Sequence, residues 1–253
     1  MASSDPFRDV QVERVQPLGP SMQRVTFAPR DRAALPAERP HGGHCRLRFP
    51  GRDASAPPQP RAYTYRRWHA DGRFDVDFVV HAGDGPAARW LRQVRPGACI
   101  GWRHGGPPKI CLAAPNPEPT ILIADLSGLP VMAALIEQAH PTRQVSLILT
   151  VCPDAAPDPP PQGRARIHHL PSPEDVEQHL LQHATLPGTR VFAACEATQM
   201  RRYRRLLLDV LALPRSQVIT SGYWKTGLTT EDVDQAKRRA DWFGDGPASR
   251  LGG

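Results

Sequence analysis

RAYTYR at residues 61–66 and HAGDGPAARW at residues 81–90 are the two stretches of sequence that decide the fold. Alternate side chains of a strand share a face, so Arg61 and Tyr63 are expected on one face of the first stretch and Thr64 on the other. The stretch offers a flat ring, a hydroxyl and cations whose planar forks suit phosphate. Taken alone, it is equally compatible with an ordinary amphipathic strand.

The second stretch reads as the end of a strand, a turn and the start of a helix. Gly83 and Gly85 permit a tight turn after His81, and Pro86 suits the first position of a helix that reaches about Val94. The start of such a helix points free N–H groups at any anion. A plain helix start would explain the stretch alone, but the two stretches together supply what a flavin dinucleotide needs.

The composition is that of a soluble globular protein. The 253 residues are 40% hydrophobic and 23% charged. They contain no apolar run of about 18 residues, and the N-terminus has no secretory signal, so we expect no membrane span and a cytoplasmic location. The net charge of +7 attracts anions, but no nucleic-acid-binding motif accompanies it. The five cysteines form no CxxC pair, which predicts buried free thiols and no metal site.

The first half of the chain reads as short strands separated by turns rich in Pro and Gly. Apolar and polar residues alternate at residues 10–15, 22–27, 45–49 and 74–80, which predicts four strands. A Pro-rich segment fills residues 50–60. Short strands joined in this way predict an antiparallel barrel.

After about Ala113, strands and helices alternate. Buried strands are expected at residues 120–124, 145–151 and 190–194, and helices at residues 130–139, 173–183 and 198–211. This alternation predicts a parallel, doubly wound sheet. The Pro-rich stretch that follows Ala113 reads as a linker. We therefore expect a barrel domain at residues 1–113 and an α/β domain with a C-terminal tail at residues 114–253.

Taken together, the motifs resemble the siderophore-interacting protein family, which are FAD-dependent ferric-siderophore reductases of the ferredoxin-reductase-like group. The pattern RxYTxR, followed by a strand and HxGxGPAxxW, carries the resemblance in the first half. In the second half, residues 124–132, 194–197 and 222–227 are similar to the family's GDxTALPA-like turn, AGE-A segment and GYWRxG signature. Order and spacing agree from about Val10 to Gly227.

The resemblance implies a Greek-key, FAD-binding barrel of the ferredoxin-reductase type, followed by a parallel-sheet domain that binds NAD(P)H. By that likeness, Tyr63 lies against the flavin ring and Thr64 hydrogen-bonds near its N5 edge. Arg61 and Arg66 would hold the phosphate-side atoms of FAD. The rest of the FAD site would come from His81, Gly83, Gly85, Pro86, Ala87 and Ala88.

On the nicotinamide side the resemblance implies a second set of residues. These are Asp125, Ser127, Gly128 and Glu196. Lys225 is implied as a ligand for an anionic siderophore. Four departures from the family pattern fall nearby. Ala124 and Cys195 replace glycines, Leu126 replaces an acidic residue and Ser127 replaces a threonine. Each added side chain is expected to narrow the space for a nicotinamide nucleotide, unless the substitution is simply tolerated.

The implied reaction is hydride transfer from NAD(P)H to FAD, then single-electron transfer to a ferric siderophore or other ferric chelate, and release of Fe(II). The redox chemistry belongs to the cofactor, so no protein side chain is assigned a catalytic role. Two alternatives stay open: an oxidoreductase with a non-siderophore acceptor, and a flavin-binding protein with a degenerate hydride-donor site. A monomer is expected. The arginines within residues 201–205 favour NADPH, although a solvated helix face explains them equally well.

Overall fold

The structure, a computed structural model, describes most of the chain. The described residues are 6–31, 35–53, 55–157, 163–184, 186–228, 230–237, 239 and 242. The chain divides into two compact units. Unit 1 comprises Met1–Ala113, Pro130–Ala139 and Asp154–Gly163, and unit 2 comprises Ala114–Leu129, His140–Pro153 and Arg164–Gly253.

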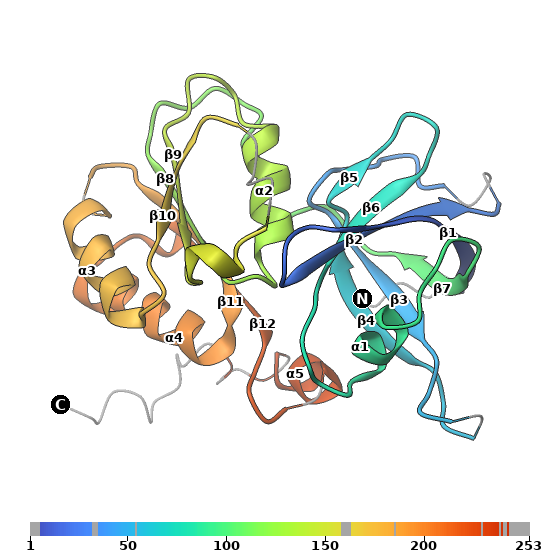
Figure 1. Cartoon of the computed structure of the whole chain (residues 1–253). Helices are drawn as coiled ribbons and strands as arrows, with labels where there is room; N and C mark the ends of the chain where they lie inside the picture. Colours follow the sequence, from blue (N-terminus) through green and yellow to red (C-terminus); the bar gives the residue numbers. More distant parts are fainter. Residues whose placement is uncertain are drawn as a thin grey trace. The chain divides into compact units, whose positions relative to one another are not determined.

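Unit 1 is built on a seven-stranded antiparallel sheet (Figure 1). Its strands are β1 (Arg8–Pro17), β2 (Met22–Pro29), β3 (His44–Phe49), β4 (Gln59–Thr64), β5 (Arg67–Trp68), β6 (Phe74–Val79) and β7 (Cys99–His104). Their order is β4-β3-β7-β1-β2-β6-β5. The four strands predicted from alternation correspond to β1, β2, β3 and β6, whereas β7 is a strand that the sequence did not single out.

The sheet closes into a barrel at the RAYTYR stretch. β4 and β5 are the two edge strands, yet only Tyr65 and Arg66 separate them along the chain. The amide of Tyr65 donates to the carbonyl of Gly43 at 2.7 Å, beside β3. The amide of Arg66 donates to the carbonyl of Asp75 at 2.9 Å, on β6. The predicted antiparallel barrel is therefore confirmed, and the closure joins two edges that would otherwise expose unpaired backbone groups.

Strand alternation fills this barrel with large apolar side chains. On β3, Cys45, Leu47 and Phe49 are buried while their neighbours are more exposed, as one dry face requires. Phe27 of β2 stacks on Phe74 of β6 with ring centroids 5.4 Å apart. These rings belong to one continuous hydrophobic core, which holds the RAYTYR corner in place.

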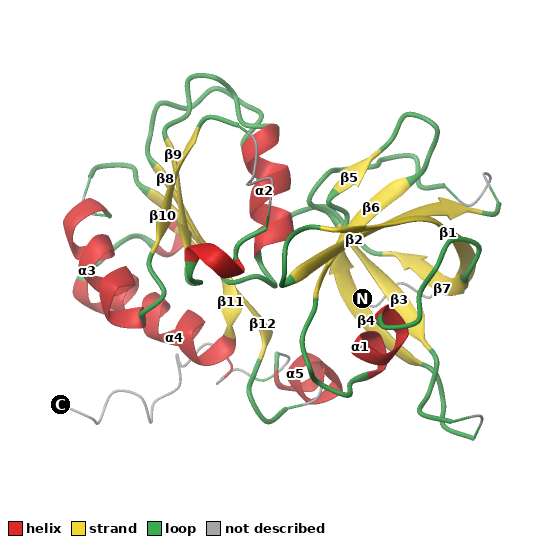
Figure 2. Ribbon diagram, in the orientation of Figure 1, coloured by secondary structure: helices red, strands yellow, loops and turns green. Residues whose placement is uncertain are grey.

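Unit 2 contains a five-stranded parallel sheet (Figure 2). Its strands are β8 (Thr120–Ala124), β9 (Val145–Leu149), β10 (Ala165–His169), β11 (Arg190–Glu196) and β12 (Val218–Trp224). Their order is β10-β9-β8-β11-β12, so the chain adds two strands on one side of β8 and then returns to add two on the other. This reversal confirms the doubly wound sheet, in which ligands bind beyond the carboxyl ends of the strands near the reversal.

The four predicted helices are present at their expected positions but not always with the expected length, and the described residues include a fifth that the sequence did not single out. They are α1 (Pro86–Leu91), α2 (Leu129–Glu137), α3 (Pro173–His183), α4 (Ala197–Arg205) and α5 (Thr230–Ala236). α3 begins as predicted, because the Ser172 side chain accepts the Asp175 amide at 3.0 Å. The single helix predicted at residues 198–211 instead ends as α4 and continues as a π-helical turn at Leu206–Val210.

Candidate functional site

The two stretches that decide the fold meet in one aromatic cluster. The ring of Tyr63, on β4, lies 4.5 Å from that of Phe78 near the end of β6 and 5.7 Å from that of Phe49. Trp90 of α1 lies 5.5 Å from Phe49 and 6.0 Å from Phe78, measured between ring centroids. Tyr63 is half-buried. It therefore keeps an accessible surface on which a flat ring could stack.

Tyr65 has a different environment. It is fully buried, and its hydroxyl accepts a hydrogen bond from the Trp102 indole at 2.9 Å and lies 3.1 Å from Nδ1 of His104. Burial raises the pKa of both Tyr63 and Tyr65. Tyr65 thus serves the barrel core, and Tyr63 is the tyrosine that a ligand could reach.

An exposed turn at residues 81–85 follows β6. The amide of Gly83 donates to Nδ1 of His81 at 3.0 Å, which folds the turn back on itself. A Cβ added to Gly83 would lie 2.6 Å from the His81 ring, so the side chain of any other residue would push that ring aside. The conformation of this turn therefore favours glycine at position 83.

The turn leads into α1, whose first turn is open. Gly85 is the N-cap, Pro86 is the first helical residue, and no side chain of the described residues caps the helix. The amides of Ala87 and Ala88 lie in the first turn, where no intrahelical acceptor exists. A Cβ on Gly85 would meet no heavy atom within 4 Å. The helix start therefore offers backbone donors beside open space.

Three arginines that the sequence analysis did not assign surround this turn. Arg92 donates to the carbonyl of Gly83 and to Asp84 Oδ1, both at 3.1 Å, and Arg52 donates to Asp84 Oδ2 at 3.2 Å. Arg89 donates to the carbonyl of Asp84. One carboxylate thus faces three guanidinium groups. Helical spacing could have pointed to Arg89 and Arg92, but Arg52 is remote in sequence and carries no local signal.

Arg66 is paired with carboxylates of unit 1. Both terminal nitrogens of its fork donate to the Glu137 carboxylate, and its Nε lies 3.7 Å from Asp77 Oδ2. Its side chain is only 7% exposed, so this ion pair is internal to unit 1. Burial alone would raise the pKa of Glu137, but hydrogen bonds and charge from Arg66 and Arg67 outweigh it and lower that pKa. Arg66 is therefore engaged as a buried counter-ion. Arg61, which is half-buried, donates to Gln59 Oε1 at 2.7 Å.

These features of unit 1 fit a flavin dinucleotide. A flat isoalloxazine ring suits the accessible face of Tyr63, since aromatic rings favour stacked or edge-on partners. Phosphates suit backbone donors at a helix start and arginine forks. The open space beside Gly85 leaves room for a ligand to approach those donors.

In unit 2, Asp125 joins the carboxyl ends of three strands. Its Oδ1 accepts the amides of Ser127 and Gly128 at 2.8 and 3.1 Å, and the Ser127 hydroxyl at 2.5 Å. Its Oδ2 accepts the Glu196 amide at 2.9 Å and the Trp224 indole at 2.8 Å. The structure thus brings the predicted nicotinamide-side residues together around Asp125.

Glu196 also uses its carboxylate within the fold. It is buried and caps α4 by accepting the amides of Thr198 and Gln199 at 2.5 and 3.1 Å. Gly128 is fixed by packing, because a Cβ there would overlap the carbonyl oxygen of Ala194 on β11. The two carboxylates and the glycine therefore shape this edge of the sheet.

Cys195 is fully buried and packs into the core of unit 2 together with Met200 and Tyr203. Burial, followed by the charges of Asp125 and Glu196, raises the pKa of its thiol. The expectation that Cys195 narrows the space for a nicotinamide nucleotide stays a prediction. Of the other departures, Ala124 is fully buried and Leu126 is half-buried.

Lys225 follows β12 directly, beyond the carboxyl end of the sheet, and is half-buried. The preceding Trp224 is 46% exposed, with its indole nitrogen held by Asp125. The structure therefore places Lys225 at the same edge as Asp125 and Glu196.

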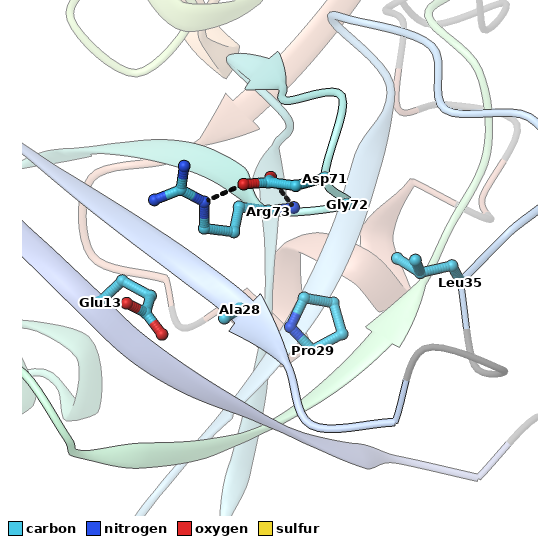
Figure 3. Close-up of a pocket in the computed structure, with 7 residues that line it drawn as sticks. All are labelled: Glu13, Ala28, Pro29, Leu35, Asp71, Gly72 and Arg73. Atoms are coloured by element: carbon cyan, nitrogen blue, oxygen red, sulfur yellow. Dashed lines mark hydrogen bonds and ion pairs between the residues drawn. The ribbon is translucent and has the colours of Figure 1, made fainter.

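A separate pocket of about 270 Å³ lies on unit 1 (Figure 3). It is lined by Glu13, Ala28, Pro29, Leu35, Asp71, Gly72 and Arg73. Within the pocket, Asp71 accepts a hydrogen bond from the Arg73 guanidinium at 2.8 Å. None of the residues predicted for cofactor binding lines this pocket.

The thiols differ from expectation, because Cys99, Cys111 and Cys152 are exposed and only Cys45 and Cys195 are buried. Within the described ranges, no group of His, Cys, Asp and Glu side chains could hold a metal ion. No described helix is long and apolar enough to cross a membrane.

An antiparallel barrel with these features, followed by a doubly wound parallel sheet, defines an FAD-containing oxidoreductase of the ferredoxin-reductase-like class. Residues 52–107 match the model of the siderophore-interacting FAD-binding domain, and residues 117–227 match that of the siderophore-interacting protein. The chain belongs to the siderophore-interacting protein family.

Individual relatives agree with this assignment. The chain is 24% identical to ferric vibriobactin reductase ViuB of Vibrio cholerae, in an alignment that covers 87% of this chain and 94% of the relative. It is 24% identical to ferric acinetobactin reductase of Acinetobacter baumannii, covering 71% of this chain and 65% of the relative. Among solved structures, a siderophore-interacting protein from Acinetobacter baumannii superimposes with a TM-score of 0.78, at 20% identity, over 92% of this chain and 96% of that chain.

Proposed function

We propose that the protein is an FAD-dependent ferric-siderophore reductase that uses NAD(P)H to reduce chelated Fe(III) and release Fe(II). The observation that carries the proposal is the meeting of the RAYTYR corner with the turn and start of α1, where an accessible Tyr63, open backbone donors and arginines surround one region of unit 1. The matching relatives named as ferric-siderophore reductases support the choice of acceptor.

The first domain, residues 1–113, supplies the FAD site in this proposal. Tyr63 provides the stacking ring, and the neighbouring Thr64 provides a hydroxyl. Phosphates and ribityl oxygens are held by donors from Arg61, His81, Gly83, Gly85, Ala87, Ala88, Arg52, Arg89 and Arg92. Pro86, which has no N–H, begins the helix that presents these amides. When bound, FAD supplies the redox chemistry, taking a hydride from the nicotinamide and passing electrons singly to ferric iron. Because Arg66 is paired with Glu137, we place it as a support of the barrel corner.

The second domain, residues 114–253, supplies the hydride-donor and chelate sites. Asp125, Ser127, Gly128 and Glu196 shape the edge on which the nicotinamide nucleotide lies, and Lys225 attracts anionic ferric chelates. The less tightly held ferrous ion then leaves the chelate. The three exposed thiols suit a reducing cytoplasm, where we place the protein.

An anaerobic titration tests this function. Protein loaded with FAD should lose its flavin absorbance on addition of NADH or NADPH and recover it on addition of a ferric chelate, with Fe(II) captured by a coloured ferrous chelator. Reoxidation by quinones or flavoprotein acceptors alone would point to the non-siderophore oxidoreductase. Absence of bleaching would point to a degenerate hydride-donor site, and failure to bind FAD would remove the proposal's basis.

The Lys225→Ala variant tests the chelate site. The Arg205→Ala variant, at an exposed arginine of α4, removes one positive charge elsewhere and serves as its control. We expect Lys225→Ala to raise KM for anionic ferric chelates several-fold, because an exposed charge interaction contributes roughly 1 kcal/mol or less to binding. The same variant should also weaken the salt dependence of the reduction rate. Neutral chelates should be reduced as before. Equal effects of the two variants would contradict a specific role for Lys225.

A further inference from the structure

The carboxyl edge of the unit 2 sheet bears on the choice between NADH and NADPH. In doubly wound sheets the dinucleotide lies across the strand ends near the reversal, and the adenosine ribose lies beside the strand that follows the first crossover. Here that strand is β9, which neighbours β8 on one side and β10 on the other. An acidic side chain or a neutral environment there suits the free 2′-hydroxyl of NADH, whereas an arginine suits the 2′-phosphate of NADPH.

The first four residues beyond β9, and the first four beyond β10, contain no Lys or Arg. β9 is followed by Thr150, Val151, Cys152 and Pro153, and β10 by Leu170, Pro171, Ser172 and Pro173. All eight residues are described, and none is Lys or Arg. The first turn of α3 then adds Glu174 and Asp175, of which Glu174 is paired with Arg202 of α4 at 2.7 Å.

Two of the arginines of α4, which favoured NADPH on sequence grounds, are engaged by partners within unit 2. Arg202 donates to Glu174 at 2.7 Å and to Glu177 Oε2 at 2.7 Å, and these contacts hold its fork against α3. Arg201 donates to the carbonyl of Trp242 at 2.6 Å, and its guanidinium lies 4.7 Å from the centroid of the Trp242 ring. Both guanidinium groups are therefore held by partners within unit 2.

β10 carries one arginine, Arg166, toward its amino end, and histidines toward its carboxyl end. Burial, followed by the charges of His183 and Arg166, lowers the pKa of His168. Burial likewise lowers the pKa of His179, whose ring centroid lies 4.7 Å from that of His168. The lowered pKa values favour the neutral form of both rings, and a neutral ring offers no positive charge to a phosphate.

We infer that the hydride donor of this protein is NADH, and that the 2′-phosphate of NADPH is rejected by the uncharged strand end at residues 150–153. A phosphate dianion brought to that edge loses water without gaining a cationic partner. The inference rests on the proposed function for its assignment of a dinucleotide to unit 2.

The inference can be tested without hydride transfer. Binding of ADP-ribose and of 2′-phospho-ADP-ribose to the FAD-loaded protein is measured by calorimetry at pH 8. We expect ADP-ribose to bind about tenfold or more tightly, on the order of a single lost charged hydrogen bond. Equal affinity, tighter binding of the 2′-phosphorylated fragment, or binding of neither fragment would overturn the inference.

A gain-of-charge pair sharpens the test. Cys152→Arg places a cation beyond β9, and Cys111→Arg adds the same charge at another exposed cysteine. Cys152→Arg should narrow the preference for ADP-ribose several-fold, and Cys111→Arg should leave it unchanged. An identical change in both variants would show that only net charge matters and would overturn the assignment to β9. Selective binding without flavin bleaching would leave the inference standing and remove the proposed hydride transfer.

Discussion

The candidate sites of the two units use their polar groups in opposite ways. In unit 1, the turn at residues 81–85 is exposed, the start of α1 has no side-chain cap among the described residues, and three arginines face one carboxylate. In unit 2, Asp125 and Glu196 accept hydrogen bonds from backbone amides of the fold itself. The first site has donors available to an anion, and the second has its acceptors already satisfied.

The polar groups of unit 1 are therefore suited to ligand binding, and those of unit 2 to stabilising the fold. Backbone donors beside open space contribute little to the free energy of folding. They form stabilising hydrogen bonds only when a ligand binds. A buried carboxylate that satisfies several amides stabilises the fold, since each unpaired buried group costs about 1–3 kcal/mol. Substitutions in the unit 1 site should therefore change FAD affinity, and substitutions at the unit 2 edge should first change the free energy of unfolding.

The largest difference is expected between two glycines. Gly128→Ala would drive a methyl group into the carbonyl of Ala194, so we expect a loss of about 3 kcal/mol or more. Gly85→Ala meets no atom within 4 Å and should leave folding nearly unchanged. Thermal unfolding followed by circular dichroism measures both. Similar unfolding temperatures for the two variants would show that the edge at Gly128 is not rigid.

Asp125→Ala should have the next largest effect. It removes the acceptor for the amides of Ser127, Gly128 and Glu196 and for the Trp224 indole. We expect a loss of about 2–4 kcal/mol in the free energy of unfolding, with FAD affinity preserved in the folded protein. Asp125→Asn, which keeps one acceptor oxygen, should fall between Asp125→Ala and the parent. A large loss of FAD affinity with an unchanged free energy of unfolding would contradict the conclusion that Asp125 mainly stabilises the fold.

Local patterns predicted most of this architecture. Alternation located four barrel strands, and the change to alternating strands and helices located the doubly wound sheet. The closure of the barrel at Tyr65 and Arg66 was not predictable, because it depends on pairing with Gly43 and Asp75 at a distance in sequence. The π-helical turn at Leu206–Val210 likewise has no sequence pattern that separates it from a longer α4.

The features of the candidate sites also differ in how far local sequence predicts them. Tyr63 and the turn before α1 were predictable because each belongs to a short stretch with a recognisable order. The pairing of Arg66 was not, since its partner Glu137 lies far along the chain. The orientation of Cys195 required the register of β11, because a shift of one residue moves a side chain to the other face.

The two tyrosines of unit 1 should respond differently to substitution. Tyr63→Ala should raise the Kd for FAD about 10- to 100-fold, because it removes an accessible ring that contributes stacking and buried area. Tyr65→Phe keeps the core ring but loses the hydrogen bond from Trp102, so it should cost about 1–2 kcal/mol of stability with FAD affinity unchanged. Fluorescence quenching of FAD gives the first quantity, and urea unfolding gives the second. A greater loss of FAD affinity in Tyr65→Phe would mean that the buried tyrosine contacts the flavin.

The smallest effect is expected at Arg52, whose pairing with Asp84 lies in solvent. Arg52→Ala should raise the Kd for FAD only about two- to fivefold at low salt, since exposed charge interactions contribute about 0.2–1 kcal/mol. The effect should vanish near 0.5 M salt, where charges are screened within roughly 4–5 Å. Arg30→Ala, at an exposed arginine just beyond β2, serves as the control for a general loss of positive charge. If Arg30→Ala weakens FAD binding as much as Arg52→Ala does, net charge attracts the dinucleotide, and the arginines around Asp84 do not form a specific phosphate site. A larger, salt-resistant effect at Arg52 would instead show that its guanidinium leaves Asp84 and pairs directly with a phosphate when FAD binds.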